Sequence, residues 1–344
     1  MQAVILVGGL GTRLRPITYD VPKALVPLRN RPFMGYMLDF LRNGGLDGAV
    51  LSLGYLPTPI QEYLAGFDLA GFSVDYAVEE HALGTAGGIK NAARFLREGG
   101  SVVAVNGDVL SGTDLKSLIE RHKETDALAT ITLTSVEDPT AYGLVEVDHD
   151  MVVRRFIEKP AADEVTTNLV NAGIYVLEPE VLEMIPPGRE VSIEREIFPD
   201  LVGSGLYGYL AAGYWKDIGT PQRYLEGTWD LLAGVVDSTL PERDETGSLV
   251  YEGGLTSGAH IGPQAVVGHH CSVGSDSSVE RAVLHDRVAI GADCSLRECI
   301  VAEGARIGDG AEVRAGAVIG KDARIGAGAV IEEDARVQPG EEVG

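Results

Sequence analysis

Basic residues are scarce in this chain: 28 Lys and Arg stand against 51 Asp and Glu, which gives a formal net charge of -23. A chain with this balance repels polyanions, so the composition argues against binding to DNA, RNA or an anionic membrane. Any phosphate ligand must therefore be held by a local cluster of basic side chains.

Cysteine is also rare, and long hydrophobic runs are missing. The three cysteines, an odd and sparse set, argue against a disulfide framework and favour a reducing compartment. The start MQAVILVGG has no signal-peptide pattern, and no apolar run is long enough to span a bilayer. We therefore expect a soluble cytoplasmic protein, and 344 residues suffice for two domains.

Strand-like and helix-like segments alternate through the first two thirds of the chain. This alternation predicts a Rossmann-like α/β domain over residues 1–235 with a mixed, mostly parallel sheet. In such sheets ligands bind at the carboxyl ends of the strands, where GGLGTR, NGD and the loop after Val78 are expected. We expect strands near 3–7, 49–53, 74–78, 101–105, 129–134 and 172–177, a hairpin over 142–156, and helices near 32–43 and 86–96.

A different period begins after residue 255. Aliphatic residues recur every six positions, with slips to five at 279–284 and 296–301, and alanine follows four residues later through the last repeats. So many repeats in phase indicate a parallel β-helix, here expected to be left-handed, over 255–344. Residues 236–254 are then expected to form a linker.

The segment VILVGGLGTRLRPITYDVPK fits neither common nucleotide motif. The dinucleotide fingerprint needs glycine where Leu14 stands, and a P-loop needs Gly-Lys-Ser/Thr where the chain has Gly-Thr-Arg. Arg13, Arg15 and Lys23 follow the glycines, in a chain that is short of positive charge. The segment therefore favours a triphosphate or pyrophosphate site, with backbone N–H groups contributing.

GGLGTRLRPIT and PKALVPLRNRP together resemble the signature of the sugar-1-phosphate nucleotidyltransferases, also called sugar-nucleotide pyrophosphorylases. The resemblance continues through GTAGG at 84–88, NGD at 106–108, EKP at 158–160, NAGIYVLEPEV at 171–181 and WKDIGTP at 215–221. A β-helix tail is also common in this family. Within it the chain looks most like the mannose-1-phosphate guanylyltransferases, given GTAGG, NAGIYVLEP and the stretch SIEREIFP. The resemblance implies condensation of a nucleoside triphosphate with a sugar 1-phosphate, giving a nucleotide sugar and pyrophosphate.

Family positions imply a set of site residues. Arg13 and Lys23 would act on the triphosphate as the catalytic cations, because arginine and lysine neutralise charge that builds on the leaving pyrophosphate. Asp108 and Asp217 would hold a magnesium ion, which prefers a few carboxylates plus substrate oxygens and water. The implied nucleotide ligands are Leu6, Gly8, Gly9, Gly11, Thr12, Glu79, Gly84 and Thr85, and the implied sugar-phosphate ligands are Gly143, Glu158, Lys159 and Asn171.

The base preference depends on one residue. Glu79 lies where thymidylyl and uridylyl members usually carry glutamine, and a carboxylate accepts both adjacent guanine donors, N1–H and the 2-amino group. This favours GTP, although Glu80 could take the same role. Mannose 1-phosphate is the favoured sugar, and a glucose-1-phosphate thymidylyl- or uridylyltransferase is the alternative.

Other readings of the chain remain open at this point. A non-catalytic regulatory subunit that binds nucleotide sugar is one, and an acetyltransferase with a histidine base in the β-helix is another, which the lack of a loop insertion disfavours. Cys271 and Cys294 occupy small inward positions and are expected to fill the core. The flat faces and open end of the β-helix favour a homo-oligomer.

Overall fold

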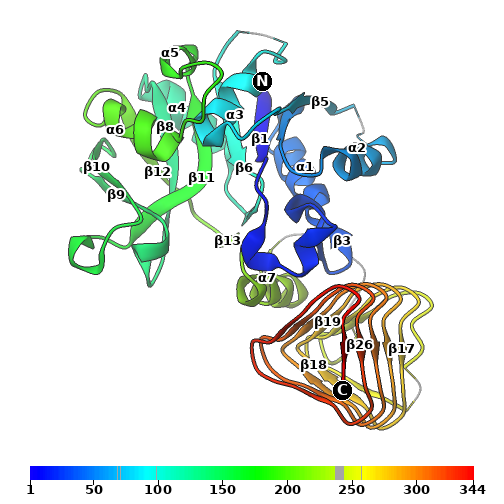
Figure 1. The fold of residues 1–344 in the computed structure, drawn as a ribbon. Helices are drawn as coiled ribbons and strands as arrows, with labels where there is room; N and C mark the ends of the chain where they lie inside the picture. The colour runs from blue at the N-terminus through cyan, green and yellow to red at the C-terminus, as the bar shows by residue number, and fades with distance from the viewer. Residues whose placement is uncertain (68, 70, 98, 237–243, 257) are drawn as a thin grey trace. The chain divides into compact units, whose positions relative to one another are not determined.

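The structure is a computed structural model that describes residues 1–344 except 68, 70, 98, 237–243 and 257 (Figure 1). By its internal contacts the chain divides into two compact units. One unit, here called the sheet unit, comprises 1–9 and 37–215, and the other, the helix unit, comprises 10–36 and 216–344. The first unit therefore lacks the segment 10–36, which the sequence pattern places in the α/β domain.

The sheet unit contains one nine-stranded mixed sheet in the order β10-β9-β11-β6-β1-β4-β5, with β8 between β11 and β12. The pairs β1–β4, β4–β5, β1–β6 and β8–β12 are parallel, whereas β11 runs antiparallel to β6 and β8. The expected α/β fold is confirmed, as is the hairpin of β9 and β10. The strands are β1 (Gln2–Val7), β4 (Gly48–Leu53), β5 (Ser73–Val78), β6 (Val102–Asn106), β8 (Ala129–Ser135), β9 (Gly143–Val147), β10 (Val153–Glu158), β11 (Leu169–Leu177) and β12 (Leu206–Leu210).

Helices pack on this sheet because each buries one apolar face. In α3 the buried residues include Ala86, Ile89 and Ala92, at the spacing of a helix that lies against a sheet. The expected helix from residue 86 begins two residues earlier, at Gly84. The helices of this part of the chain are α1 (Phe33–Asn43), α2 (Pro57–Ala65), α3 (Gly84–Ala93), α4 (Leu115–Glu124), α5 (Pro179–Met184), a π-helical turn (Ile193–Ile197) and α6 (Phe198–Leu201).

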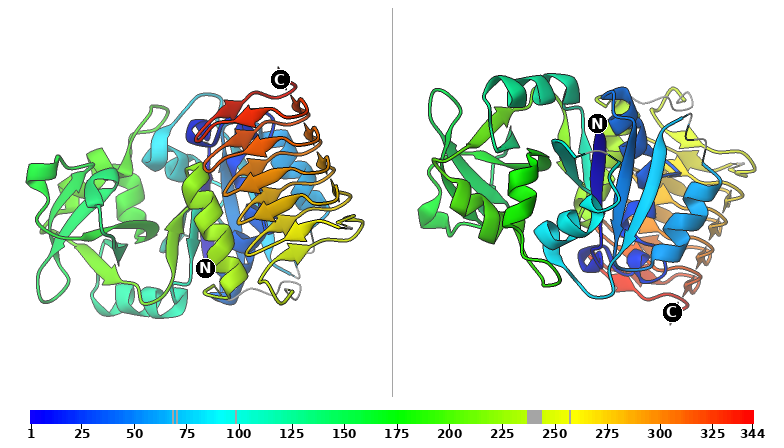
Figure 2. Two further views of the ribbon diagram at one scale, coloured as in Figure 1. Left: turned by 90° about the horizontal axis from the view of Figure 1, so that it is seen from below. Right: turned by 90° about the horizontal axis from the view of Figure 1, so that it is seen from above.

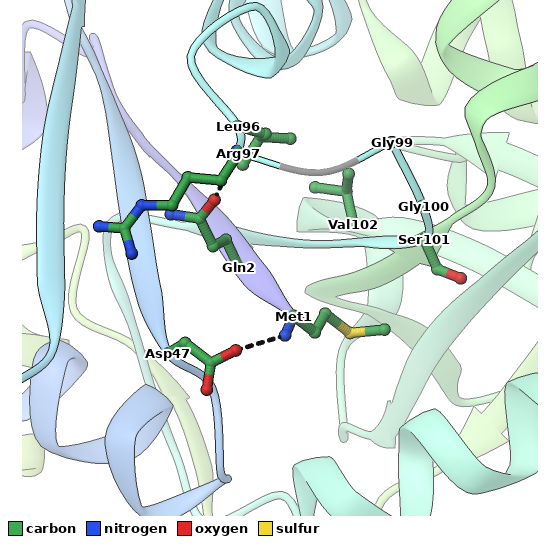
Figure 3. Close-up of a pocket in the computed structure, with 9 residues that line it drawn as sticks. All are labelled: Met1, Gln2, Asp47, Leu96, Arg97, Gly99, Gly100, Ser101 and Val102. Carbon is green, nitrogen blue, oxygen red and sulfur yellow. Dashed lines mark hydrogen bonds and ion pairs between the residues drawn. The ribbon is translucent and has the colours of Figure 1, made fainter.

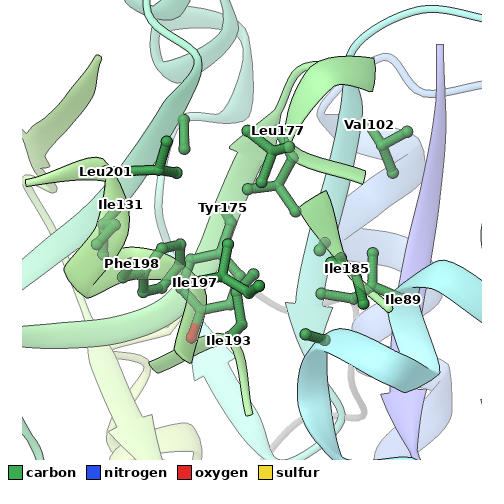
Figure 4. Packing of buried hydrophobic residues seen from close by; sticks show 14 of the residues in the cluster. Ile89, Val102, Ile131, Tyr175, Leu177, Ile185, Ile193, Ile197, Phe198 and Leu201 are labelled. Carbon is green, nitrogen blue, oxygen red and sulfur yellow. The ribbon is translucent and has the colours of Figure 1, made fainter. Parts of the chain in front are cut away.

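The core of the sheet unit gathers around Tyr175 on β11 (Figure 4). The Tyr175 ring lies edge-on to Phe198, with ring centroids 5.1 Å apart, and both side chains are fully buried. Ile193 and Ile197 pack into the same cluster. The π-helical turn is therefore held in place by the core, which fixes the polar residues that it also carries.

The helix unit contains a parallel β-helix with three sheets, and Figure 2 shows its coils stacked one on the next. Val267 pairs with Leu284 and Leu284 with Val301, whereas Val301 pairs with Ile319, one residue further along. The five-residue slips in the sequence are thus one-residue shortenings of the early coils. The three sheets have the orders β14-β16-β19-β22-β25-β28, β15-β18-β21-β24-β27 and β17-β20-β23-β26-β29.

The residues of the six-residue repeat fill the interior of this β-helix, as expected. Leu284, Val301 and Ile319 are fully buried, and most of the alanines between the aliphatic positions are buried as well, whereas those of the last coils are partly buried. Cys271, Cys294 and Cys299 are free thiols in the same core. The 29 strands of the described residues end with the β-helix strands β14 (Leu249–Val250), β15 (His260–Ile261), β16 (Val266–Val267), β17 (Ser272–Val273), β18 (Ser278–Glu280), β19 (Val283–Leu284), β20 (Ala289–Ile290), β21 (Ser295–Arg297), β22 (Ile300–Val301), β23 (Arg306–Ile307), β24 (Glu312–Val313), β25 (Val318–Ile319), β26 (Arg324–Ile325), β27 (Val330–Ile331), β28 (Arg336–Val337) and β29 (Glu342–Val343).

The first strand of the β-helix, β14, falls inside the segment 236–254 that the sequence pattern assigns to a linker. Leu249 and Val250 pair in parallel with Val266 and Val267. Polar and glycine residues around this pair hide the repeat in the sequence. Part of the expected linker, 237–243, lies outside the described residues.

The remaining elements of the helix unit precede the β-helix in sequence. Three short 3-10 turns lead into a hairpin of β2 and β3, and Thr220 accepts a hydrogen bond from the Arg223 N–H (3.3 Å) to cap helix α7. Among the described residues, no helix is both long and apolar enough to cross a lipid bilayer. These elements are η1 (Thr12–Leu14), η2 (Ile17–Tyr19), η3 (Lys23–Leu25), β2 (Pro27–Leu28), β3 (Arg31–Pro32) and α7 (Pro221–Ala233).

Candidate functional site

The sheet unit presents its glycine loops at the carboxyl ends of the parallel strands. Gly107, directly after β6, donates its N–H to the Leu6 carbonyl at 2.9 Å, and a Cβ there would meet that oxygen at 2.3 Å. The NGD motif therefore needs glycine for close approach to β1, and this places Asp108 beside the loop that follows β1. The predicted residues Leu6, Gly8 and Gly9 lie along this same stretch.

A hollow of about 400 Å³ at the opposite edge of these strands serves as a comparison (Figure 3). It is lined by Met1, Gln2 and Val102, at the amino ends of β1 and β6, and by Asp47, which binds the Met1 ammonium at 2.7 Å. None of the predicted ligand residues lines it. Because open α/β sheets bind ligands beyond the carboxyl ends, the candidate site is the edge that carries the glycine loops.

Glu79 is held in a fixed position at that edge. Its Oε1 accepts a hydrogen bond from the Ser52 hydroxyl at 2.7 Å, and its Oε2 accepts one from the Leu83 N–H at 3.1 Å. A Cβ on Gly8 would lie 3.2 Å from Oε1, so Gly8 and Glu79 are neighbours. Glu80 is exposed and next to Glu79 in the chain, but no such contacts orient it among the described residues. Glu79 is therefore held in one orientation by its neighbours.

Gly84 and Thr85 lie at the start of α3 and contact the segment 191–194. Gly84 has φ +69°, and a Cβ there would meet the Val191 carbonyl oxygen at 2.5 Å. The Thr85 hydroxyl donates to Glu194 Oε2 at 2.7 Å and accepts from the Ile193 N–H at 2.8 Å. Thr85, predicted to bind nucleotide, therefore ties α3 to the π-helical turn.

Three of the four predicted sugar-phosphate ligands lie together on β9, β10 and β11. A Cβ on Gly143 would lie 3.0 Å from Glu158 Oε2 and 3.4 Å from the Asn171 Cβ. The Asn171 amide donates to the buried Tyr175 hydroxyl at 2.8 Å. The fourth residue, Lys159, directly follows Glu158 at φ +54° and donates its N–H to Tyr142.

A second carboxylate, Glu194, lies close enough to influence this group. Burial raises the pKa of Glu158, and repulsion from Glu194 raises it further, while Lys159 and Arg195 act in the opposite direction. Burial and the charge of Glu194 also raise the pKa of Tyr175 well above its usual value. The motif comparison includes SIEREIFP but assigns no role to Glu194, because its approach to Glu158 depends on the tertiary fold.

The helix unit carries the predicted catalytic cations, and they converge on one glycine. A Cβ on Gly219 would lie 2.5 Å from Asp217 Oδ1, 2.6 Å from Arg13 Nη2 and 3.1 Å from Lys23 Nζ. A methyl group on Gly219 would therefore have to displace the charged ends of these three side chains. Gly219 is a functional residue that the sequence reasoning missed, although it belongs to the WKDIGTP motif.

Asp217 is buried and organises the cluster around Gly219. Its Oδ1 accepts the Gly219 N–H at 2.6 Å and lies 3.9 Å from Lys23 Nζ, and its Oδ2 accepts from Arg223 Nη1 at 2.6 Å. Arg223 comes from the first turn of α7 and was not predicted. The cluster holds more positive than negative groups, as the acidic composition requires of a phosphate site.

The glycine loop before the cluster is folded by local contacts. Gly11 has φ +61°, and the Thr18 hydroxyl donates to its carbonyl oxygen at 2.8 Å. A Cβ on Gly11 would lie 3.3 Å from the Lys23 Cβ, so the turn that begins at Thr12 lies against Lys23. Arg15, whose role the sequence left open, stacks instead on the Tyr19 ring at 4.8 Å.

Both predicted metal ligands have the chemistry that magnesium requires. Asp108 and Asp217 offer carboxylate oxygens, which are the hard ligands that magnesium prefers. The residues present therefore fit magnesium.

With this geometry in place, comparison with known proteins assigns the family. A nucleotidyl transferase family model matches residues 2–234, which is more than half of the chain, so the protein belongs to that family. A model described as the EIF2B subunit epsilon LbH domain matches residues 253–331, within the β-helix.

The relatives with curated names are consistent with one another. The chain is 40% identical over 300 residues to a mannose-1-phosphate guanylyltransferase of Mycobacterium tuberculosis, covering 86% of this chain and 83% of the relative. It is 35% identical over 318 residues to a probable mannose-1-phosphate guanylyltransferase 1 of Oryza sativa, covering 89% and 82%. The resemblance drawn from the motifs is thus confirmed.

Among solved structures, HddC from Yersinia pseudotuberculosis is similar in fold and sequence. The match has a TM-score of 0.58 and 31% identity, and it covers 67% of this chain and 99% of HddC. A second structure of HddC, described as a complex with GMP-PN, matches equally well, with 30% identity.

Proposed function

We propose that the protein condenses GTP with mannose 1-phosphate to give GDP-mannose and pyrophosphate. The observation that carries this proposal is the convergence of Arg13, Lys23 and Asp217 on Gly219, in a chain whose curated relatives are mannose-1-phosphate guanylyltransferases. A regulatory subunit without catalytic activity would have no need to keep this cluster. Its retention supports an active enzyme.

The reaction requires one bond to form and one to break. An oxygen of the sugar phosphate attacks the α-phosphorus of GTP, the bond to the bridging oxygen breaks in line, and pyrophosphate leaves with that electron pair. Arg13 and Lys23 neutralise the charge that builds on the leaving group, which is the main catalytic requirement of such a transfer. No covalent intermediate with the protein is needed.

The sheet unit supplies hydrogen-bond acceptors for the two substrates. Glu79 would accept the guanine N1–H and 2-amino group, and the contacts with Ser52 and Leu83 orient its carboxylate in advance. Glu158 would accept hydroxyl groups of the sugar, and Lys159 would bind its phosphate. Asp108 and Asp217 would hold Mg²⁺, which when bound neutralises phosphate charge.

Two broader parts of the proposal concern the setting of the enzyme. The three free cysteines support a reducing compartment, and we place the protein in the cytoplasm.

We also propose a homo-oligomer, since the β-helix ends in strands that stack on one another. Light scattering coupled to size exclusion measures the particle mass, and a mass of one chain at micromolar concentration contradicts the oligomer.

A pyrophosphate-release screen tests the function. The purified protein is assayed with GTP, ATP, UTP and dTTP against mannose, glucose and heptose 1-phosphates in the presence of Mg²⁺. We expect the highest kcat/KM for GTP with mannose 1-phosphate. Preference for dTTP or UTP with glucose 1-phosphate would instead establish the alternative activity, and no pyrophosphate with any pair would reject catalysis.

A further inference from the structure

The phosphate-binding segment 10–36 belongs to the same compact unit as the β-helix. This segment carries Arg13 and Lys23 and ends in the hairpin of β2 and β3. The residues at the tip of the hairpin, Arg29 and Asn30, have φ +47° and +61°, and Asn30 is one of the few side chains that tolerate this conformation well. The tip is therefore a rigid turn whose side chains point in defined directions.

The tip of the hairpin contacts the β-helix directly. The Asn30 amide donates to Asp286 Oδ1 at 2.8 Å, and the Tyr251 hydroxyl donates to the Arg29 carbonyl oxygen. Arg29 is itself buried and donates from Nη1 to the Leu231 carbonyl on α7 at 3.1 Å. Because Asp286 Oδ1 also accepts the His269 N–H at 2.7 Å, its carboxylate is fixed by the β-helix.

A second contact runs through the first turns of α7. The Tyr224 hydroxyl donates to the Pro27 carbonyl, at the start of the hairpin, and lies 3.1 Å from His285 Nε2 on the β-helix. Both side chains are buried. Since the hydroxyl proton goes to Pro27, the Tyr224 oxygen accepts from His285, which holds that imidazole with its proton on Nε2.

These two contacts lie next to the catalytic cluster in the chain. Tyr224 is adjacent to Arg223, whose guanidinium orients Asp217 at 2.6 Å. Pro27 is four residues after Lys23, and Lys23 and Val26 are joined by a backbone hydrogen bond of 3.2 Å. A shift of the hairpin or of the α7 start would therefore move Lys23 and Asp217 relative to each other.

We propose that the β-helix positions the catalytic cluster, and that Tyr224 and Asn30 are the positioning residues through which His285 and Asp286 act. The β-helix is in this view part of the active enzyme rather than only a tail for assembly. The proposal deepens the proposed function, because it concerns the same pyrophosphate-binding cluster. Neither Tyr224 nor Asn30 touches substrate in this account.

Tyr224→Phe is the first test, because it removes the hydroxyl that joins Pro27 to His285 and keeps the ring. We expect kcat to fall about tenfold while the KM for mannose 1-phosphate stays within about twofold, since misplacement of a catalytic group affects the chemical step. Measurements are made well below the unfolding midpoint of each variant, so that every sample is fully folded.

Trp229→Phe is the matched control. Trp229 also lies on α7 and also ties it to the β-helix, through a 3.1 Å hydrogen bond from Nε1 to the Arg281 carbonyl and through Arg281 stacked 3.6 Å above the ring. Among the described residues, its hydrogen bond and its ring contact both go to Arg281 rather than to the hairpin. We expect this variant to lower the unfolding midpoint and to leave kcat within about twofold of wild type.

A charge-swap pair tests the Asn30 contact independently and provides a rescue. Asn30→Asp places a carboxylate against Asp286 and should lower kcat by about tenfold, because like charges at this separation repel. Combining Asn30→Asp with Asp286→Asn leaves a single carboxylate in the contact and so removes the repulsion between like charges. We expect the double variant to recover most of the lost kcat.

The outcomes separate positioning from a purely structural contact. If Tyr224→Phe and Asn30→Asp lower the unfolding midpoint yet leave kcat within about twofold, as Trp229→Phe does, the proposal is overturned. Failure of the double variant to recover kcat while it folds normally also overturns the Asn30 part. If Tyr224→Phe does not fold, the proposal is tested by Asn30→Asp alone and in combination with Asp286→Asn.

Binding of inorganic pyrophosphate keeps this test distinct from the function itself. If wild type releases no pyrophosphate with any substrate pair, the proposed function fails. Calorimetric titration with pyrophosphate and Mg²⁺ still measures the affinity of the cluster for pyrophosphate. We expect Tyr224→Phe and Asn30→Asp to weaken this affinity about tenfold and Trp229→Phe to leave it unchanged. Equal affinities for all the variants would overturn the positioning role.

Discussion

The two units carry opposite kinds of charged groups among the residues that the motifs assign to substrate binding. In the sheet unit the charged groups are mainly carboxylates, with Glu158 and Glu194 close enough that one raises the pKa of the other. In the helix unit Arg13 and Lys23 converge with a single carboxylate on Gly219. Acceptors suit the N–H and O–H donors of a base and a sugar, whereas cations suit a triphosphate.

The comparison shows how an acidic protein can bind a polyanion. A net charge of -23 opposes phosphate binding at long range, but salt screens such a field over about 10 Å. The cations of the helix unit act at contact distance, where screening is weak.

The largest expected effect is a loss of stability of the helix unit as the pH falls. Burial lowers the pKa of His285 to about 4, with Asp286 acting in the opposite direction, so the folded helix unit binds fewer protons than the unfolded chain between pH 4 and 6.5. Stability of the helix unit should therefore fall as the pH drops through this window, by about 3 kcal/mol in total. Hydrogen exchange of the β-helix strands as a function of pH measures this loss.

His285→Phe is the control for the pH effect, because it fills the same space without a titrating group. Its β-helix should lose less stability between pH 6.5 and 4 than that of wild type, while exchange in β1, β4 and β6 should change equally in both proteins. Parallel pH curves for the two proteins would contradict the assignment to His285.

The next largest effect comes from filling the space around Gly219. Gly219→Ala puts a methyl group within 2.5–3.1 Å of Asp217, Arg13 and Lys23, so these groups must move apart. We expect kcat to fall about 100-fold, since displacement of catalytic groups by about 1 Å has effects of this size. Gly66→Ala, where only the Tyr63 carbonyl lies near, at 3.8 Å, should retain wild-type turnover. Retained activity in Gly219→Ala would mean that the cluster is not catalytic.

A smaller effect is expected from Glu79, the residue of the sheet unit proposed to bind the guanine base. Glu79→Gln keeps the shape of the side chain but replaces one acceptor oxygen by a donor, which faces the guanine donors unfavourably. The preference for GTP over UTP, measured as a ratio of kcat/KM, should fall about tenfold or more. Glu80→Gln, at the exposed neighbour, should leave the ratio unchanged, and an unchanged ratio in Glu79→Gln would exclude Glu79 from base recognition.

The smallest expected effect is a shift in the pH dependence of kcat/KM. If Glu158 must be ionised to accept sugar hydroxyls, kcat/KM falls as the pH drops through the pKa of Glu158. Because Glu194 raises that pKa and Arg195 lowers it, Glu194→Gln should move the acid limb to lower pH and Arg195→Gln should move it to higher pH. Two shifts in the same direction would show that the limb reports another group.

Local patterns in the sequence were sufficient to predict much of the fold and of the candidate site. The six-residue repeat predicted the β-helix because each repeat buries one aliphatic side chain, such as Leu284 or Val301, in the same way. The glycine loops predicted the ligand edge of the sheet because parallel strands end on one side. The repeat failed at β14, where Leu249 and Val250 stand among polar residues, and at Leu255, which is exposed rather than buried.

Motifs also named Glu158, Asn171 and Gly143, which the structure brings together. They missed Glu194, whose carboxylate accepts a hydrogen bond from the Thr85 hydroxyl. The reason is that Glu194 is more than 100 residues from Thr85, and nothing local in either segment encodes their meeting.

The sequence by itself determined the family, the two architectures and the residue types of the site, because these depend on local periodicity and on short motifs. The tertiary structure decided that the segment with Arg13 and Lys23 shares a compact unit with the β-helix, through Asn30 and Tyr224. Such contacts are made by single side chains from distant segments, so they leave no repeat in the sequence.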